Sequence, residues 1–247
     1  MRFAILPQTD ARLMVAAAIL LAATSSPALA QYADRFSATA EVASDERRRG
    51  LSWSDGDPVV RGTIAVQATE GLSFDAAATS LWDSSRHRGA DTVVDLGTSY
   101  ARQMGAWRLS ARGVYHLFPG ASRQGYGEVG AGAGFLIGPA NIDVNASYAP
   151  RQHSIGGDNL YLSASASSGI PGTPFTVSAN VGLSSGRVRD DQDAARLRPD
   201  GTYWDHGVSI DYLKRQWFVG VRYANSSIDG EARHSGATLI GRAGIAF

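Results

Sequence analysis

The 247-residue sequence contains no cysteine, so neither disulfide bonds nor cysteine-ligated metal sites can stabilise the fold. Its formal net charge is zero, which argues against nucleic acid as a partner, because nucleic-acid-binding domains carry an excess of Lys and Arg. After the first 30 residues, no stretch approaches the roughly 18 consecutive apolar residues of a membrane-spanning helix. If the remainder of the chain enters a membrane, it does so as β-strands.

The start of the chain predicts a secretory signal peptide. Two arginines border a short charged segment, residues 13–23 are all apolar, and Ala28-Leu29-Ala30 fits the small-residue cleavage pattern. The apolar run is too short to cross about 30 Å of hydrocarbon as a helix, which favours a cleaved leader over a retained anchor. We therefore expect a signal peptide over residues 1–30 and one exported domain over residues 31–247.

The exported part alternates apolar and polar residues at the period of a β-strand, whose successive side chains point to opposite faces. The clearest example is residues 140–149, where Ile142, Val144 and Tyr148 alternate with polar neighbours. Twelve such segments occur, each close to the ten or so residues that a tilted strand needs to cross a bilayer. The predicted strands cover residues 36–45, 58–68, 72–82, 92–102, 107–118, 125–137, 140–149, 159–167, 174–184, 203–213, 216–225 and 235–247.

The connections between these segments alternate between long and short. Together with the even strand number, this predicts an all-β fold, a 12-stranded antiparallel up-and-down transmembrane β-barrel with both termini on the periplasmic side. A soluble β-sandwich would also have evenly spaced strands, but it would not favour this alternation of loop lengths. The closing segment ends on Phe247 and resembles the last strand of bacterial outer-membrane barrels, whose terminal aromatic residue is read by the insertion machinery. The resemblance implies an outer-membrane location, with lipid and the barrel-assembly machinery as partners.

Charged residues within the predicted strands fall almost entirely on one face. Because an arginine facing lipid near the midplane would cost about 2–4 kcal/mol, this face must line the lumen; Arg102, at a strand end, is the exception. These positions are the candidate selectivity residues of a pore. They are Glu41, Arg61, Asp75, Asp95, Arg108, Arg112, Glu128, Asp143, Asp211, Arg222 and Arg242.

A motif near the start of the barrel carries a family resemblance. Residues 40–45 read AEVASD and are followed by Arg47, by RGLS at residues 49–52 and by DGDP at residues 55–58. This pattern resembles the amino-terminal signature of the TorF family of porins. The resemblance implies an outer-membrane channel without established functional residues.

We therefore expect a monomeric porin for passive diffusion of small hydrophilic solutes. The inward arginines either form a basic ladder for an anionic solute or, as we favour, pair with carboxylates and stiffen the wall. A barrel plugged by its loops, with a structural or adhesive role, is the first alternative.

A lipid-modifying enzyme is the less favoured alternative. His153-Ser154 and His116 are the closest matches to a catalytic site, but neither has a recognisable base and nucleophile arrangement. Residues 190–193 lack the glycine and distal glutamate of a calcium loop, and favour a solvated acidic loop. We expect no catalytic residues, no metal and no cofactor.

Overall fold

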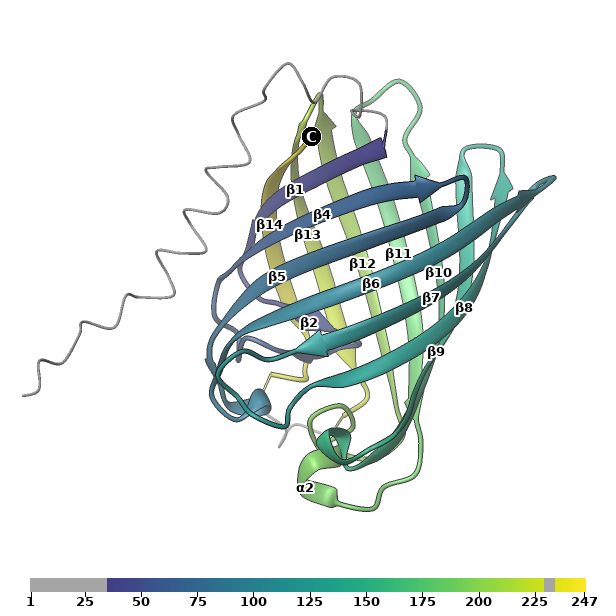
Figure 1. Ribbon diagram of the computed structural model, residues 1–247. Coiled ribbons are helices and arrows are strands. Elements are labelled where there is room, and N and C mark those ends of the chain that lie inside the picture. The colour runs from purple at the N-terminus through teal and green to yellow at the C-terminus, as the bar shows by residue number, and fades with distance from the viewer. Residues whose placement is uncertain (1–34, 229–233) are drawn as a thin grey trace, which may run out of the picture.

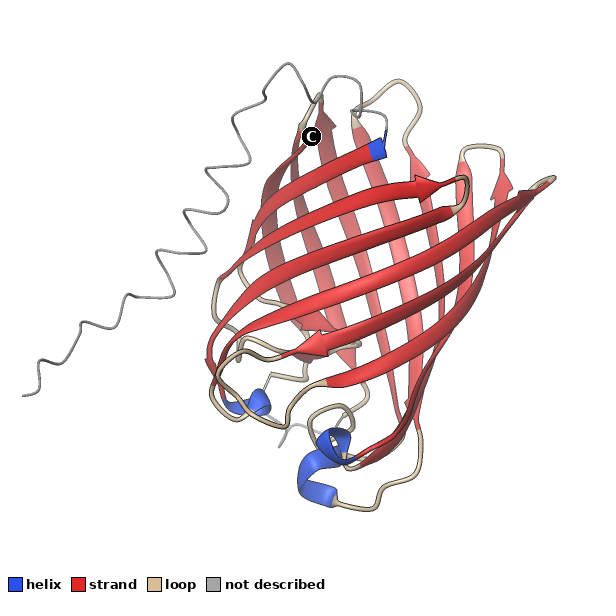
Figure 2. Cartoon of the chain, in the orientation of Figure 1, coloured by secondary structure: helices blue, strands red, loops and turns tan. Residues whose placement is uncertain are grey.

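The computed structural model describes residues 35–228 and 234–247, so the predicted signal peptide lies outside the described residues. The chain forms a closed barrel of twelve antiparallel strands (Figures 1 and 2), which confirms the predicted fold class. The barrel strands are β1 (Phe36–Ala43), β4 (Val59–Thr69), β5 (Leu72–Ser84), β6 (Ala90–Met104), β7 (Trp107–Leu117), β8 (Tyr126–Ile137), β9 (Ala140–Gln152), β10 (Gly157–Gly169), β11 (Phe175–Ser185), β12 (Tyr203–Lys214), β13 (Trp217–Ser226) and β14 (Thr238–Ala246).

The barrel closes by pairing its first strand with its last. The register of β1 on β14 runs from Thr39 opposite Ala246 to Ala43 opposite Arg242. Phe247 extends the pairing, since its backbone N–H donates to Ala38 O at 2.8 Å and its carbonyl accepts from Ala38 N at 3.1 Å. Closure satisfies the backbone groups that an open sheet edge would leave exposed. The role of Phe247 as an insertion signal stays a prediction.

The two ends of the barrel differ in their connections. At one end, here called the turn end, the strands are joined by residues 70–71, 105–106, 138–139, 170–174 and 215–216. The other end, the loop end, carries residues 44–58, 85–89, 118–125, 153–156, 186–202 and, of the connection between β13 and β14, residues 227–228 and 234–237. The carboxy-terminus lies at the turn end, opposite the short helix α2 (Asp191–Ala194) (Figure 1). None of the described helices is long and apolar enough to cross a membrane.

One connection departs from the predicted alternation. Strands β9 and β10 are longer than predicted, and only residues 153–156 join them, including the 3-10 turn η4 (His153–Ile155). The sequence period breaks at Pro150 and Arg151, but backbone pairing continues to Gln152 opposite Gly157. The Gln152 side chain also exchanges hydrogen bonds with the backbone of Gly127 at 2.8 Å, which ties this extension to β8.

The two faces of the wall are sorted by polarity. The outward face exposes large apolar side chains on every barrel strand, including Val42, Ile64, Phe74, Leu96, Leu109, Val129, Val144, Leu162, Val181, Val208, Val219 and Leu239. Aromatic pairs lie outward at the turn end, such as Trp107 with Phe135 at 4.8 Å between ring centroids. Tyr161 on β10 does not join these outward aromatic residues, because its hydroxyl donates to Asp205 on β12 at 3.2 Å inside the barrel.

The interior is filled at the loop end. The side chains that pack there come from four loops and the adjoining strand ends. This buried apolar cluster consists of Trp53, Leu81, Ala90, Val93, Phe118, Tyr126, Ala149, Ile155 and Leu197. A smaller cluster joins Leu51, Tyr203 and Ile228. The loop end therefore has a hydrophobic core of its own inside the barrel mouth.

Candidate functional site

The first loop folds into the lumen as a small hairpin. Its strands are β2 (Arg47–Arg48) and β3 (Leu51–Ser52), and the turn between them has positive φ at Arg49 (53°) and Gly50 (77°). Two positive φ values in a two-residue loop are typical of a type I′ turn, which suits glycine. Gly50 is also needed for space, because a Cβ there would lie 2.7 Å from the Cβ of Asp205 on β12. The hairpin tip is thus pressed against the wall.

The arginines of this hairpin reach several separate strands. Arg48 pairs with Asp95 on β6 at 2.9 Å, and Arg49 pairs with Glu128 on β8. The Arg49 guanidinium also lies 4.6 Å from the ring centroid of Tyr161 on β10, and Tyr203 on β12 donates to the Arg49 carbonyl at 2.9 Å. The hairpin therefore spans the lumen. The sequence alone does not predict this arrangement, because Leu51 and Trp53 are too few apolar residues to indicate a core.

Buried arginines bind the other loops into a cap over the hairpin. Arg196 donates to Gln124 O at 3.1 Å, to the carbonyl of Ser154, and to Nδ1 of His87 at 3.0 Å. Arg86 donates from Nε to Ser52 O at 2.7 Å. Burial lowers the pKa of Arg196 to about 10, so the group remains charged at neutral pH. The Arg196 guanidinium thus joins three other loops to its own loop, residues 186–202.

Between this hairpin and the wall lies a charged cavity of about 480 Å³. Five arginines and three carboxylates line it, together with two apolar side chains: Arg47, Arg48, Arg61, Arg222, Arg242, Glu41, Asp45, Glu46, Ala43 and Ile240. The side chains of Arg61 and Arg242 are 37% and 36% exposed, so water reaches them. The cavity is a charged compartment within the lumen, with two more arginines than carboxylates.

Inward glycines let ion pairs form along the wall. Arg242 on β14 contacts Asp211 on β12 at 2.8 Å by reaching over Gly220, which is paired with both residues. A side chain at Gly220 would collide with the Asp211 carboxylate. Arg112 on β7 reaches Asp75 on β5 in the same way and makes two bonds, at 2.7 and 2.9 Å. Strands separated by one intervening strand are thereby cross-linked, because a glycine on the strand between them leaves room for the ion pair.

Eight of the eleven charged positions predicted to line the lumen form ion pairs with one another or with residues of the first loop and β7, and the lumen lining as a whole stays a prediction. Five arginine or histidine side chains pair with five of the six predicted carboxylates, and Asp95 has two of these partners, since it accepts from His116 Nδ1 at 2.7 Å as well as from Arg48. Within the described ranges, Arg108 and Arg222 have no carboxylate within 4 Å. Arg61, Arg112 and Arg242 are thus paired with carboxylates, while Arg108 and Arg222 are not. Their role in selectivity stays a prediction.

The positions considered for catalysis or calcium have structural contacts. The His153 side chain is exposed at the loop end, with Nδ1 3.5 Å from Asp193, and Ser154 is buried beside it. Asp190 caps α2 by accepting from Asp193 N at 3.0 Å, and Asp193 pairs with Arg88. The prediction of a solvated acidic loop is wrong for Asp193, which is buried. In residues 35–228 and 234–247, no group of three or more His, Cys, Asp or Glu is placed to hold a metal ion.

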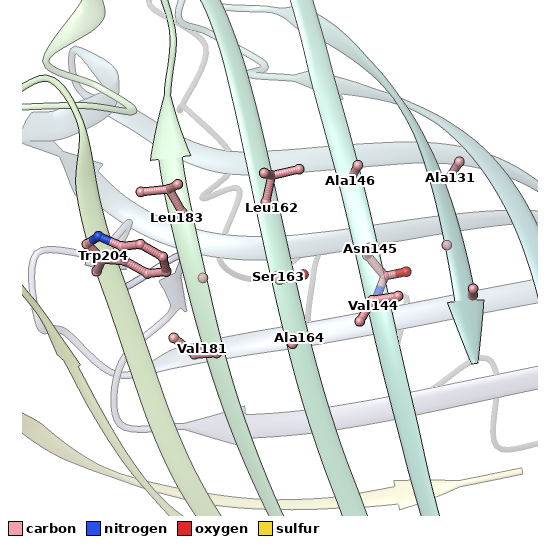
Figure 3. Close-up of a pocket in the computed structure, with 13 residues that line it drawn as sticks. Ala131, Val144, Asn145, Ala146, Leu162, Ser163, Ala164, Val181, Leu183 and Trp204 are labelled. Carbon is pink, nitrogen blue, oxygen red and sulfur yellow. The ribbon is translucent and has the colours of Figure 1, made fainter. Parts of the chain in front are cut away.

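A second pocket, of about 590 Å³, lies on the outward apolar face of β8 to β12 (Figure 3). Four alanines line it, together with larger side chains such as Leu162, Val181 and Trp204. The difference in side-chain size accounts for the depression. It is a feature of the surface that faces away from the charged lumen.

Comparisons with known proteins define the family. Residues 28–244 match the family described as "Bacterial protein of unknown function (Gcw_chp)". The chain belongs to this family. No curated protein matches the Gcw_chp chain. Membership of the TorF family stays a prediction.

Solved structures similar to the Gcw_chp chain include a porin, an autotransporter translocator domain and an outer-membrane channel. A NanC porin has a TM-score of 0.59 at 12% identity, over 86% of this chain and 98% of that one. The translocator domain of the autotransporter NalP from Neisseria meningitidis has a TM-score of 0.44 at 12% identity, over 96% and 97%. The outer-membrane channel DcaP of Acinetobacter baumannii has 0.42 at 14%, over 83% and 68%. At these identities the first of them supports a porin-like barrel fold, and the fold alone.

Proposed function

We propose that this protein is an outer-membrane channel through which small hydrophilic solutes diffuse passively. The observation that carries the proposal is the sorting of side chains across one closed wall. Apolar residues face outward, as hydrocarbon requires, while arginines and carboxylates face a lumen that water reaches at Arg61 and Arg242. Charged side chains at close range set which solutes pass. The selectivity of the channel thus resides in the inward arginines and carboxylates.

In this proposal residues 1–30 direct export, the turn end faces the periplasm and the loop end faces outward. The barrel-assembly machinery inserts the closing strand with its terminal Phe247, and the apolar outer face contacts lipid. The protein acts as a monomer. The hairpin of the first loop narrows the lumen, because it contacts β6, β8, β10 and β12.

Single-channel conductance in planar bilayers tests the proposal. Purified full-length protein should give discrete, steady current steps. Heat-modifiable electrophoretic mobility serves as the control that the barrel is folded in each preparation. Folded protein that inserts but carries no current would overturn the proposal.

The filled loop end favours one other function, a plugged barrel with a structural or adhesive role. Its support is the nine-residue apolar cluster and the hairpin that crosses the lumen. Silence in bilayers from the wild type would favour this function. The proposal assigns no reaction to the protein, and His153 and His116 contribute contacts to Asp193 and Asp95.

A further inference from the structure

The charged cavity under the hairpin has more cationic donors than its own carboxylates can use. Asp45 is already occupied by Arg47 at 3.2 Å and by the hydroxyls of Ser52 and Ser54. Glu46 accepts from Arg48 at 2.7 Å and from Arg61 at 3.3 Å through the same oxygen. The third carboxylate, Glu41, lies 3.8 Å from Arg242. The acidic residues of the cavity are thus committed to existing partners.

Some guanidinium N–H donors of the cavity arginines remain available to bind a further anion. Arg222 lines the cavity and has no carboxylate within 4 Å among the described residues. Arg61 uses one terminal nitrogen for Glu46 and is 37% exposed. Burial lowers the pKa of Arg47, and the charge of the nearby Arg222 lowers it further, against the opposing effect of Asp45. Like charges therefore face one another across the cavity, and an anion placed between them would relieve this repulsion.

We infer that this cavity is a binding site for a small oxyanion-bearing solute, held by Arg222 and Arg61. The guanidinium fork matches carboxylate and phosphate oxygens equally, so the inference names their shared chemistry. A volume of about 480 Å³ is within the range of small-molecule sites, roughly 300–1,000 Å³. The inference deepens the proposed function by naming the class of solute.

Calorimetric titration of the detergent-purified full chain tests the site without requiring current. The probes are succinate and inorganic phosphate, with glycerol as a neutral control. We expect saturable binding of one or both anions and none of glycerol. A response to succinate alone identifies a carboxylate site, and a response to phosphate alone a phosphate site. No saturable binding of either anion would overturn the inference.

Two matched variants locate the site. Arg222→Gln should weaken anion binding about tenfold or more, since it removes a charge-assisted partner. Arg108→Gln removes another lumen arginine that has no carboxylate within 4 Å in the described residues but does not line the cavity, and should leave affinity within about twofold. Arg222→Lys keeps the charge but loses the fork, so it should recover only part of the affinity. Equal losses in Arg222→Gln and Arg108→Gln would overturn the site.

The two proposals fail separately. Anion binding by a protein that carries no current would leave the site standing and remove the channel. Current without saturable anion binding, or binding unaffected by Arg222→Gln, would remove the site and leave the channel.

Discussion

The loop half and the turn half of the barrel interior are built from the same strands but follow different packing rules. In the loop half, Trp53 is 3% exposed and packs among aromatic rings that other loops contribute, including His87 at 4.4 Å and Phe118 at 5.9 Å. In the turn half, polar side chains contact one another across the strands, as Ser73 and Ser99 do at 2.8 Å and Arg112 and Asp75 do at 2.7 Å. The loop half is therefore packed like the hydrophobic core of a soluble protein, whereas the inner surface of the turn half is polar.

The difference shows how a barrel can close its mouth without changing its wall. A strand pattern specifies only which side chains face inward. What those side chains meet depends on whether a loop enters, as Arg48 and Arg49 do when they reach Asp95 and Glu128. The same inward carboxylates would face water if the first loop were elsewhere. The barrel wall and the loop residues packed inside it can therefore be altered independently of each other.

Removal of the hairpin should have the largest effect. Replacing residues 46–54 by a short Gly-Ser linker removes the segment that contacts β6, β8, β10 and β12, so single-channel conductance should rise several-fold. Planar-bilayer recording of the folded variant measures it. Replacing residues 170–174, a turn at the opposite end, should leave conductance near the wild-type value. A hairpin-free barrel with unchanged conductance would mean that the lumen is closed elsewhere.

Trp53→Ala should have the next largest effect, on stability. The side chain is buried in the loop-half cluster, and truncation of a buried aromatic residue costs about 3–5 kcal/mol. Urea titration of the folded barrel in detergent measures the loss. Trp107→Ala is the matched control, because Trp107 lies outward in the turn half and is half exposed. A greater loss for Trp107 than for Trp53 would contradict the idea of a separate core in the loop half.

Much of the wall could be predicted from the sequence, and little of the filling. Alternation placed residues such as Asp95, Arg112 and Asp211 on the inner face, because strand period alone decides the face. The cap could not be predicted, since its contacts join residues far apart in the chain, such as Arg196 and His87. Local signals existed in the apolar Leu51 and Trp53 and the Arg-Gly turn of an otherwise polar loop.

The charged site shows the same limit. Arg222 and Arg242 were expected on neighbouring strands, and β13 and β14 do pair. The excess of arginines around Arg222 arises only in the folded chain, because Arg47 and Arg48 of the first loop line the same cavity although they are far from Arg222 in the sequence. Pairing of Arg112 with Asp75 over Gly97 likewise depends on register, which the pattern of polar residues does not specify.

Loss of one carboxylate should cost more in the loop half than in the turn half. Glu128 is 4% exposed and pairs with Arg49, so Glu128→Gln leaves a shielded arginine without its partner and should cost up to about 3 kcal/mol. Arg112, the partner of Asp75, is 47% exposed, so Asp75→Asn should cost about 1 kcal/mol or less. Urea titrations of both variants compare the two. Equal losses would mean that the two halves screen charge alike.

Acidification should have the smallest effect of these changes: it should lower the stability of the loop half through His87. Burial lowers the pKa of His87 well below its ordinary value of 6.5, and the neighbouring guanidinium groups of Arg196, Arg86 and Arg48 lower it further. The folded protein therefore keeps His87 neutral below pH 6.5 while the unfolded chain takes up a proton. The stability contributed by neutral His87 is complete above pH 6.5 and declines as pH falls below it.

Urea midpoints at about pH 7.5 and about pH 5.5 measure the decline. His87→Gln cannot take up this proton and should show a smaller acid-induced loss than the wild type. An identical pH dependence in the two proteins would assign the acid sensitivity to the carboxylates that both halves share.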